Sequence, residues 1–433
     1  MKATADTLVV RFESALGKEA VQSDLHVMRS YAVDGVVPSV KVMPTDAAQI
    51  GMVLKICTET GVAVIPWGGG TSMSLGNVPS RAEVVLGLER LGALIEHDDA
   101  NLTATVESGM RVAALQQVLA RRQQFLALDP PRPADATTGG VVAANTNGPR
   151  RMLYGGVRDQ VIGMKVVLAT GEQVKAGGKV VKNVAGYDMC KLFTGSLGTL
   201  GVITEVTFRM APVPERTATV LASGTLAQAL EMTERTRDSV LLPAAIAVLN
   251  AHAASTLTGG PDRHNAILGI WIEGFTEAVG RHLKDLRAMA NDVGMSADVL
   301  EGTAHDALWE RVRDFGSGTS GALFRLTVPL GAVGEAVASI SGWSPVPQIV
   351  AHAGAGTIWI LTDSEDAPAW LARLAALAAT SRGHTIIAAA PPHVKGGLDV
   401  WGPPPPGLSI MQEVKRQFDP AGILNPGRFV AGL

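Results

Sequence analysis

Cysteine and aromatic residues are scarce in this chain of 433 residues, and it has no long apolar runs. With only two cysteines, Cys57 and Cys190, it can form neither a disulfide framework nor an iron–sulfur cluster, which takes about four thiolates. No apolar run approaches the roughly 20 residues of a membrane-spanning helix, so any membrane contact is expected to be peripheral or through a partner. Any electron carrier must then be an organic cofactor, and the reducing cytoplasm is the expected location.

Charge is sparse as well. Charged residues make up 18% of the chain, the formal net charge is −3, and no block rich in lysine and arginine occurs, so we expect no nucleic-acid partner. The segment from Met1 to Arg11 lacks a basic stretch followed by an apolar one, so no signal peptide is expected. Apolar residues make up 47%, enough for sizeable cores and, at this length, for two or three domains.

One glycine-rich stretch follows a strand pattern. The apolar, partly β-branched residues from Val62 to Ile65 predict a buried strand, which runs through Pro66 and Trp67 into the segment from Gly68 to Ser72. Consecutive glycines permit positive φ and leave backbone N–H groups uncovered, and such groups can form a nest for phosphate oxygens. A glycine run is also common in plain turns. The stretch fits neither the P-loop nor the Gly-x-Gly-x-x-Gly fingerprint, in which Met73 would have to be glycine.

Further glycine motifs follow along the chain. Residues 137–140, Thr-Thr-Gly-Gly, form a second phosphate-type turn that opens the apolar segment Val141 to Ala144, and Asn145 and Gly148 close it. Residues 195–201 hold three glycines spaced by three positions and lead into a predicted strand from Val202 to Arg209. The repeated pairing of a glycine turn with an apolar segment favours a binding site over isolated turns.

Local signals also predict helices and a hairpin. Thr45 is predicted to cap a helix from Asp46 to Thr60 that places Cys57 on its apolar face, which makes Cys57 a core residue. Another helix is predicted around residues 12–20. Residues 161–169 and 173–176, joined by Thr170-Gly171, predict a hairpin.

The element pattern changes near residue 215, after Ala211-Pro212-Val213-Pro214. Beyond it a strand–helix–strand–strand–helix order occurs over residues 217–291 and again over 321–378. This repetition predicts two related α+β units that form one antiparallel sheet with helices on one face. Residues 401–406 are proline-rich and are expected to be a stiff linker before a short amphipathic helix with Met411, Val414 and Phe418 on one face.

Five motifs together resemble one family. They are residues 65–72, the turn Thr138-Gly139-Gly140, the segment Lys182-Asn183-Val184-Ala185-Gly186-Tyr187-Asp188, residues 195–203, and the terminal Asn425-Pro426-Gly427-Arg428. In this order and spacing they resemble the FAD-linked oxidases of the vanillyl-alcohol oxidase and p-cresol methylhydroxylase superfamily. Within it the chain is most similar to the glycolate oxidase FAD-binding subunits (E subunits), which residues 148–151 and 179–188 match best.

The resemblance implies an α+β fold of three parts. Residues 1–215 would form a two-part FAD-binding domain of the p-cresol methylhydroxylase type, and residues 216–390 an antiparallel α+β substrate or cap domain. Residues 391–433 would form a C-terminal segment that returns to the first domain. FAD would stretch between the halves of the FAD-binding domain, with its diphosphate at residues 68–72, its flavin ring flanked by residues 138–140 and 145–148, and its adenine at the backbone of residues 201–203.

The residues that the resemblance assigns to FAD are Pro66, Trp67, Gly68, Gly69, Gly70, Thr71, Ser72, Thr138, Gly139, Gly140, Asn145, Gly148, Gly201, Val202, Ile203 and Asn425. Family members with covalent flavin carry a histidine in the first glycine loop. Since Thr71 stands there, noncovalent FAD is predicted.

Two residues are candidates for catalysis. Flavin chemistry on a hydroxy acid needs a cation for the carboxylate and a base for the hydroxyl proton. Arg325 lies among apolar residues of a predicted strand and requires an anion, unless it lies on the open face of the sheet. His352 is the candidate base, with a histidine satisfied by backbone as the alternative.

No metal site is expected. Residues 352–359 resemble a metal- and substrate-binding segment of related D-2-hydroxy-acid dehydrogenases, His-Ala-Gly-Asp-Gly-Asn-Leu-His. Here Ala355 and Trp359 replace its aspartate and second histidine. His393 and Lys395, on a loop flanked by proline and glycine, rank below Arg325 and His352.

Two functions remain open. The chain is either an FAD-dependent enzyme that oxidises glycolate or a similar 2-hydroxy acid to the 2-oxo acid, or a noncatalytic flavin-binding subunit of a glycolate oxidase complex. In the complex it would accompany a catalytic flavoprotein subunit and an iron–sulfur subunit. The missing metal histidine favours the second function, and the intact glycine motifs keep the first.

Overall fold

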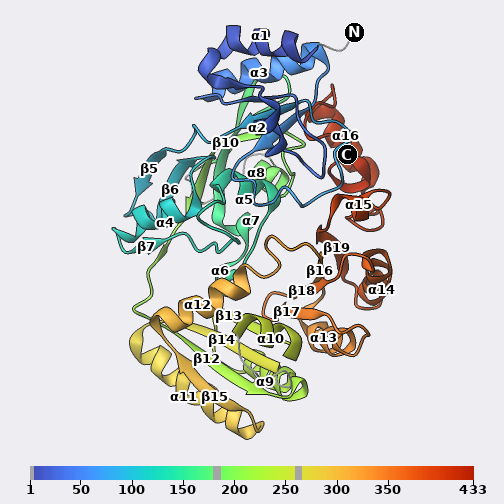
Figure 1. Ribbon diagram of the computed structural model, residues 1–433. Helices are drawn as coiled ribbons and strands as arrows, with labels where there is room; N and C mark the ends of the chain where they lie inside the picture. The colour runs from blue at the N-terminus through green and yellow to red at the C-terminus, as the bar shows by residue number, and fades with distance from the viewer. Residues whose placement is uncertain (1–3, 179–186, 259–265) are drawn as a thin grey trace. The chain divides into compact units, whose positions relative to one another are not determined.

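The computed structural model describes residues 4–178, 187–258 and 266–433 (Figure 1). They form two units: the first comprises Met1–Thr146, Gly156–Pro212 and Lys395–Leu433, and the second comprises Asn147–Gly155 and Val213–Val394. Of the motif at residues 182–188, only Tyr187 and Asp188 lie within the described residues.

A small sheet in the first unit carries the strand that enters the glycine-rich stretch. Its order is β1-β2-β4-β3, with β2, β4 and β3 parallel and β1 antiparallel to β2. The strands are β1 (Val21–Gln22), β2 (Val40–Val42), β3 (Val64–Trp67) and β4 (Val84–Gly87), and the helices of this region are α1 (Ala5–Leu16), α2 (Leu25–Arg29) and α3 (Ala47–Thr60). Phe12 of α1 and Ile50 of α3 share a buried cluster with Val64 of β3, so the strand that leads to the loop is fixed from behind.

Three boundaries differ from the sequence prediction. The cap of α3 is Asp46, whose side chain accepts from the Gln49 N–H, and not Thr45. Helix α1 begins well before residue 12, because Thr4 caps it, and it stops at Gly17, whose φ is 90°.

The predicted core position of Cys57 in α3 is confirmed, since this residue is fully buried.

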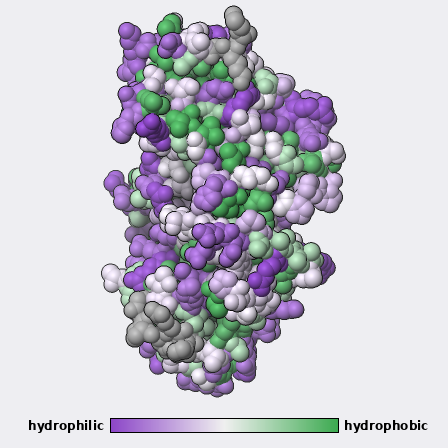
Figure 2. Space-filling model, turned by 45° about the vertical axis from the view of Figure 1, so that its right-hand side comes forward, coloured by the Kyte–Doolittle hydropathy of each residue, from purple (hydrophilic) through white to green (hydrophobic). Residues whose placement is uncertain are grey.

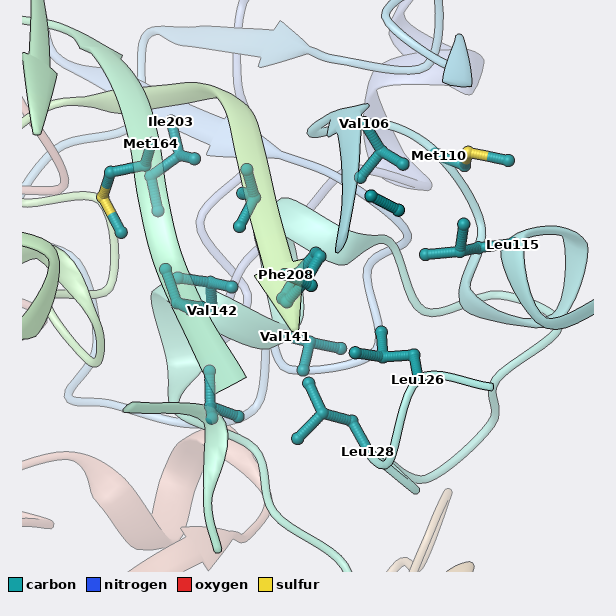
Figure 3. Close-up of a cluster of buried hydrophobic side chains, with 14 of the residues drawn as sticks. Val106, Met110, Leu115, Leu126, Leu128, Val141, Val142, Met164, Ile203 and Phe208 are labelled. Carbon is teal, nitrogen blue, oxygen red and sulfur yellow. The ribbon is translucent and has the colours of Figure 1, made fainter. Parts of the chain in front are cut away.

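The second sheet of this unit is antiparallel, in the order β5-β6-β10-β8-β9. Its strands are β5 (Leu94–Asp98), β6 (Thr103–Glu107), β8 (Val161–Val167), β9 (Gln173–Gly177) and β10 (Val202–Arg209). The predicted hairpin is confirmed by the pairing of β8 with β9. Figure 3 shows the core on this sheet, in which Val106 of β6 and Phe208 of β10 belong to the same buried cluster as Val141.

Helices flank this second sheet, and one of them begins where a turn is predicted. The helices are α4 (Val112–Ala120), α5 (Thr138–Ala144), α7 (Val157–Gln160), α8 (Met189–Phe193) and α16 (Leu408–Phe418), and a two-stranded pair joins β7 (Gln124–Phe125) to β11 (Ala211–Pro212). The predicted turn at residues 137–140 is instead the start of α5, because the Thr137 side chain accepts from the Gly140 N–H and caps a helix there. Val414 and Phe418 of α16 pack on the core as predicted.

The expected stiff linker is anchored at its start. Trp401 is buried, its ring lies 5.3 Å from that of Phe429, and its Nε1 donates to the Arg428 carbonyl oxygen at 3.0 Å. The proline-rich stretch is therefore preceded by a residue that is packed on the first unit.

The second unit is built on one antiparallel sheet of eight strands, in the order β15-β12-β14-β13-β17-β18-β16-β19. The strands are β12 (Arg216–Gly224), β13 (Ala245–Leu249), β14 (Ala266–Gly274), β15 (Ser296–Leu300), β16 (Ala322–Thr327), β17 (Gln348–His352), β18 (Thr357–Thr362) and β19 (His384–Ala389). Both halves share the order strand–helix–strand–strand–helix–strand, to which the first half adds one helix between β13 and β14 and another after β15, and the halves join where β13 pairs with β17. The predicted repeat and antiparallel sheet are confirmed, with one unpredicted edge strand in each half.

Helices cover both faces of this sheet, so the expectation of one covered face was wrong. The helices are α6 (Arg151–Tyr154), α9 (Leu226–Asp238), α10 (Ala251–Thr258), α11 (Thr276–Asp292), α12 (Gly302–Arg313), α13 (Val333–Ser341), α14 (Ala367–Thr380) and α15 (Pro392–Lys395), the last ending at the unit boundary. Trp309 of α12 packs with Trp271 and Val350 in a cluster that contains no residue of α9 or α11. Figure 1 shows α12 and α11 on opposite sides of β12 and β14.

No helix among the described residues combines the length and apolar character needed to cross a bilayer. On the face shown in Figure 2, hydrophilic and hydrophobic residues are interspersed.

Candidate functional site

The loop after β3 presents backbone amides that the protein itself does not use. Within the described ranges, the N–H groups of Gly69, Gly70, Thr71 and Ser72 have no protein acceptor. The turn closes through carbonyls instead, because Gly70 accepts from Met73 and Ser72 accepts from Leu75. Four successive unpaired amides are the donor set that binds anionic oxygens in a backbone nest.

The three glycines of this loop are required for different reasons. Only Gly70 has a positive φ, of 73°. A Cβ on Gly68 would overlap the Thr137 side chain, and a Cβ on Gly69 would overlap the Asp135 carbonyl oxygen. The loop thus lies directly against residues 135–137, which lead into α5. This contact joins the two sheets of the first unit.

A hollow of about 480 Å³, counting its open mouth, lies in front of this loop. The hollow is lined by eight of the predicted cofactor residues: Pro66, Gly68, Gly69, Gly70, Thr71, Ser72, Gly140 and Asn425. Five lining residues were not predicted: Met73, Ala143, Ala144, Leu197 and Arg428.

Four other predicted cofactor residues serve packing nearby. The Trp67 ring packs edge-on against Tyr31, with centroids 5.1 Å apart. Thr138 is buried and donates to the Glu107 carbonyl oxygen, and Gly139 lies against Ser108. Asn145 ends α5 in the left-handed conformation, with a φ of 49°.

The remaining predicted cofactor residues lie outside the lining. Val202 and Ile203 are buried in β10, and Figure 3 shows the Ile203 side chain among the core residues. Gly201 packs against Val166. Gly148 belongs to the second unit.

The C-terminal segment contributes two polar side chains to the hollow. Residues 423–425 run beside β3, where the Val64 N–H donates to the Ile423 carbonyl and the Asn425 N–H donates to the Val64 carbonyl. The Asn425 Nδ2 donates to the Leu197 carbonyl, while its Oδ1 is buried and has no partner among the described residues. Arg428 belongs to the terminal motif, but the sequence analysis predicts no role for it. Its charge, beside Gly427, is the one sequence signal of a binding role.

These groups match the chemistry of a dinucleotide cofactor. The four amides and the guanidinium of Arg428 suit phosphate oxygens, and the Asn425 Oδ1 suits a hydroxyl or N–H donor. Burial lowers the pKa of Arg428 to about 10, so this side chain stays protonated at neutral pH. The residues present therefore fit FAD.

The predicted catalytic residues share one face of the sheet in the second unit. Arg325 of β16 lies opposite Trp359 of β18, which lies opposite Val350 of β17, and His352 follows two residues later. Because side chains alternate along strands, Arg325 and His352 point to the same side. The structure thus brings the two to one surface, with β18 between their strands.

Arg325 has no carboxylate partner within the described part of the chain. Its guanidinium lies 6.0 Å from the Trp359 ring centroid. Burial lowers its pKa to about 10, and the nearby positive charge of Arg151 acts in the same direction. Two neighbouring cations with no carboxylate partner among the described residues produce a positive potential, which attracts anions.

Arg151 is held near Arg325 by a buried polar cluster. The Glu273 side chain on β14 is 1% exposed, accepts from the Tyr154 hydroxyl at 2.5 Å and pairs with Arg150 at 3.2 Å. The Arg150 guanidinium stacks 4.2 Å from the Trp271 ring centroid. These contacts pin α6 to the sheet, and sequence reasoning found none of them because Glu273 lies more than 100 residues from α6.

His352 differs from an ordinary core histidine. His305 of α12 has its Nδ1 2.8 Å from the Thr219 hydroxyl, whereas the His352 Nε2 is buried without a partner. Burial lowers the pKa of His352 to about 4, so its imidazole is neutral at neutral pH. Within residues 4–178, 187–258 and 266–433, no three His, Cys, Asp or Glu side chains are grouped to hold a metal ion.

Comparison with protein families finds two matches. A model described as an FAD binding domain matches residues 38–177, and one described as the C-terminal domain of FAD linked oxidases matches residues 403–429. The first match spans the glycine loop and α5, and the second spans Asn425 and Arg428, so both models fall on the walls of the hollow.

Known proteins are similar over most of the chain. The glycolate oxidase subunit GlcD of Bacillus subtilis (strain 168) is 30% identical over 429 residues, covering 91% of this chain and 89% of that protein. The mitochondrial D-lactate dehydrogenase [cytochrome] of Arabidopsis thaliana is 26% identical over 433 residues, covering 91% of this chain and 74% of that protein. A solved structure of p-cresol methylhydroxylase with substrate bound has a TM-score of 0.75 at 17% identity, covering 98% of this chain and 96% of that one, which shows the shared fold.

Proposed function

Because this chain belongs to the family of FAD-linked oxidases, we propose that it oxidises a small 2-hydroxy acid such as glycolate to the 2-oxo acid. It is an FAD-dependent oxidoreductase. The substrate class is supported by the relatives, since glycolate and D-lactate, in the names of those two proteins, are both 2-hydroxy acids. The assignment of the cofactor site rests on the amides of residues 69–72, which line the hollow and have no acceptor among the described residues.

The cofactor would be held by the first unit. The amides of residues 69–72 would donate to the diphosphate, and the Asn425 Oδ1 would accept from a hydroxyl or ring N–H of FAD. The flavin supplies the acceptor for the two electrons and the hydrogen that leave the substrate carbon. We also assign Trp67, Thr138, Gly139, Asn145, Gly148 and residues 201–203 to this site, as the resemblance implies, through backbone contacts or as support for the lining.

The substrate carboxylate would pair with Arg325, and Arg151 adds a second positive charge nearby. The neutral His352 would take the hydroxyl proton at its unpaired Nε2. Both roles need residues that are charged and neutral, respectively, at neutral pH. Arg325 stays charged despite its burial, because its pKa is still about 10, and burial keeps His352 neutral.

Anaerobic mixing of the purified, FAD-loaded chain with glycolate or D-lactate tests this function. Reduction bleaches the main visible band of the flavin, and the bleaching should depend on substrate concentration. A flavin that binds and stays oxidised with every 2-hydroxy acid would contradict the enzymatic function of the isolated chain.

That outcome would support the second candidate, a noncatalytic flavin-binding subunit in a complex with a catalytic flavoprotein and an iron–sulfur subunit in the cytoplasm. Trp359 and Ala355 favour it, because they stand where the related dehydrogenases carry a histidine and an aspartate. Co-purification of the tagged chain from its native cells would then recover both partners, and bleaching would return in the assembled complex.

A further inference from the structure

Two buried cations bind the backbone that directly follows the glycine loop. The Lys395 Nζ donates to the carbonyl oxygens of Ser74 and Gly76, at 2.5 and 3.1 Å. The Arg428 Nη2 donates to the carbonyls of Met73, at 2.9 Å, and of Leu75. The four successive carbonyls of residues 73–76 are thus held by two side chains of the C-terminal segment. These bonds fix the backbone conformation directly after residues 69–72.

This cluster carries an excess of positive charge. Asp34 is its carboxylate, with both oxygens 2.9 Å from the Lys395 Nζ, and the side chains of this ion pair are 0% and 6% exposed. Arg428 is 2% exposed and has no ion-pair partner among the described residues. Two cations against one carboxylate leave one positive charge buried, and a buried charge without a counterion is strongly unfavourable.

One donor group of Arg428 has no partner among the described residues, and this residue lines the hollow. Its Nη1 is buried and unpaired, while Nη2 is taken by the loop carbonyls. Arg428 lines the same hollow as the nest of Gly69 to Ser72. A ligand group that satisfies both the amides and the guanidinium must be anionic and able to accept several hydrogen bonds.

We propose that Arg428 donates from its Nη1 to the diphosphate of FAD, and that Lys395 and Asp34 are positioning residues that hold the loop and the arginine for this contact. This inference rests on the proposed FAD site. The diphosphate carries two negative charges. It would accept from two kinds of donor, the amides of residues 69–72 and the guanidinium of Arg428.

The test compares FAD with riboflavin, which has the same ring but no phosphate. Each is titrated into apoprotein and followed by flavin fluorescence. The Arg428→Met variant should weaken FAD binding about 10- to 100-fold, as expected for a charge-assisted hydrogen bond, and leave riboflavin binding unchanged within about 2-fold. Arg428→Lys should recover part of the loss, and the Arg428→Met variant should show a weaker dependence of FAD affinity on salt.

Two further variants separate this contact from loop support. Lys395→Met removes loop bonds but no unpaired donor, so it should weaken FAD binding less than Arg428→Met does and, like that variant, leave riboflavin binding unchanged within about 2-fold. Arg416→Met removes an exposed arginine that pairs with Glu413 and should change neither. If Arg428→Met does not fold, Arg428→Gln keeps an amide donor for the loop carbonyls and removes the charge, and the same comparison applies to it.

Equal losses for FAD and riboflavin in the Arg428 variants, or no loss in either, would overturn the contact with the diphosphate. Failure of the wild-type protein to bind FAD is a separate result and would overturn the proposed function itself.

Discussion

Replacing Gly69 by alanine should disturb both the loop and the site in front of it. The new Cβ would overlap the carbonyl oxygen of Asp135 and would lie 2.6 Å from the Arg111 Nη1. The backbone of residues 135 and 136 cannot move aside freely, because the Ala136 N–H donates to the Arg132 carbonyl at 2.8 Å and the Ala136 carbonyl accepts from Val112 at 2.9 Å. The loop itself must therefore give way.

Forcing one methyl group into such a packed place costs about 1–3 kcal/mol. If the loop carries all of this strain in the bound state, FAD affinity falls about 5- to 150-fold, because 1.4 kcal/mol is a factor of ten. If the folded apoprotein carries it instead, the free energy of unfolding falls by the same amount. Fluorescence titration with FAD and denaturant unfolding of the apoprotein measure the two parts separately.

Gly92 provides a matched control in the same unit. The nearest atom to a Cβ at this position is the Glu89 carbonyl oxygen, 3.9 Å away, and φ is not positive. Gly92→Ala should change both quantities by less than about 0.5 kcal/mol. If Gly69→Ala matches the wild type in FAD affinity and in stability, the close approach of the loop to Asp135 does not shape the site.

Three further predictions concern the cofactor and the candidate catalytic residues. With Thr71 in the first glycine loop, FAD should be noncovalent, so acid precipitation should leave the yellow colour in solution; colour in the pellet would contradict this. Arg325→Met should raise KM for the 2-hydroxy acid about 10- to 100-fold with a smaller change in kcat, because a charge-assisted bond to the carboxylate is lost; an unchanged KM would remove Arg325 from the substrate site. Burial lowers the pKa of His352 and His305 to about 4, against 6.5 for an unperturbed histidine, so the unfolded state binds more protons between these values. The free energy of unfolding should therefore fall as pH drops from about 6.5 to about 4, by up to about 3 kcal/mol for each histidine, and His352→Asn should flatten this slope in denaturant titrations at several pH values; an unchanged slope would show that His352 is not buried neutral.

Some elements were predictable because their causes are local. The strands β10, β12 and β14 are long and apolar, and the hairpin of β8 and β9 has its turn signal between them. By contrast, β15 and β19 escaped prediction, since each is a short edge strand placed by its partner, β12 or β16. The helices on the second face of the large sheet were missed for a similar reason, because α10 and α12 lie in connections whose route the local pattern does not specify.

The sequence alone determined that a strand runs into a loop of uncovered amides, since only glycine leaves them bare, and the motifs around the loop indicated the FAD-linked oxidases. The tertiary structure decided why Gly68 and Gly69 must be glycine, which is the close approach of residues 135–137. It also brought Lys395 and Arg428 into contact with residues 73–76, which lie more than 300 positions earlier in the sequence, and it placed Arg151 near Arg325. Charges that meet from distant segments leave no local pattern, because their partners are fixed by the path of the chain and not by spacing along it.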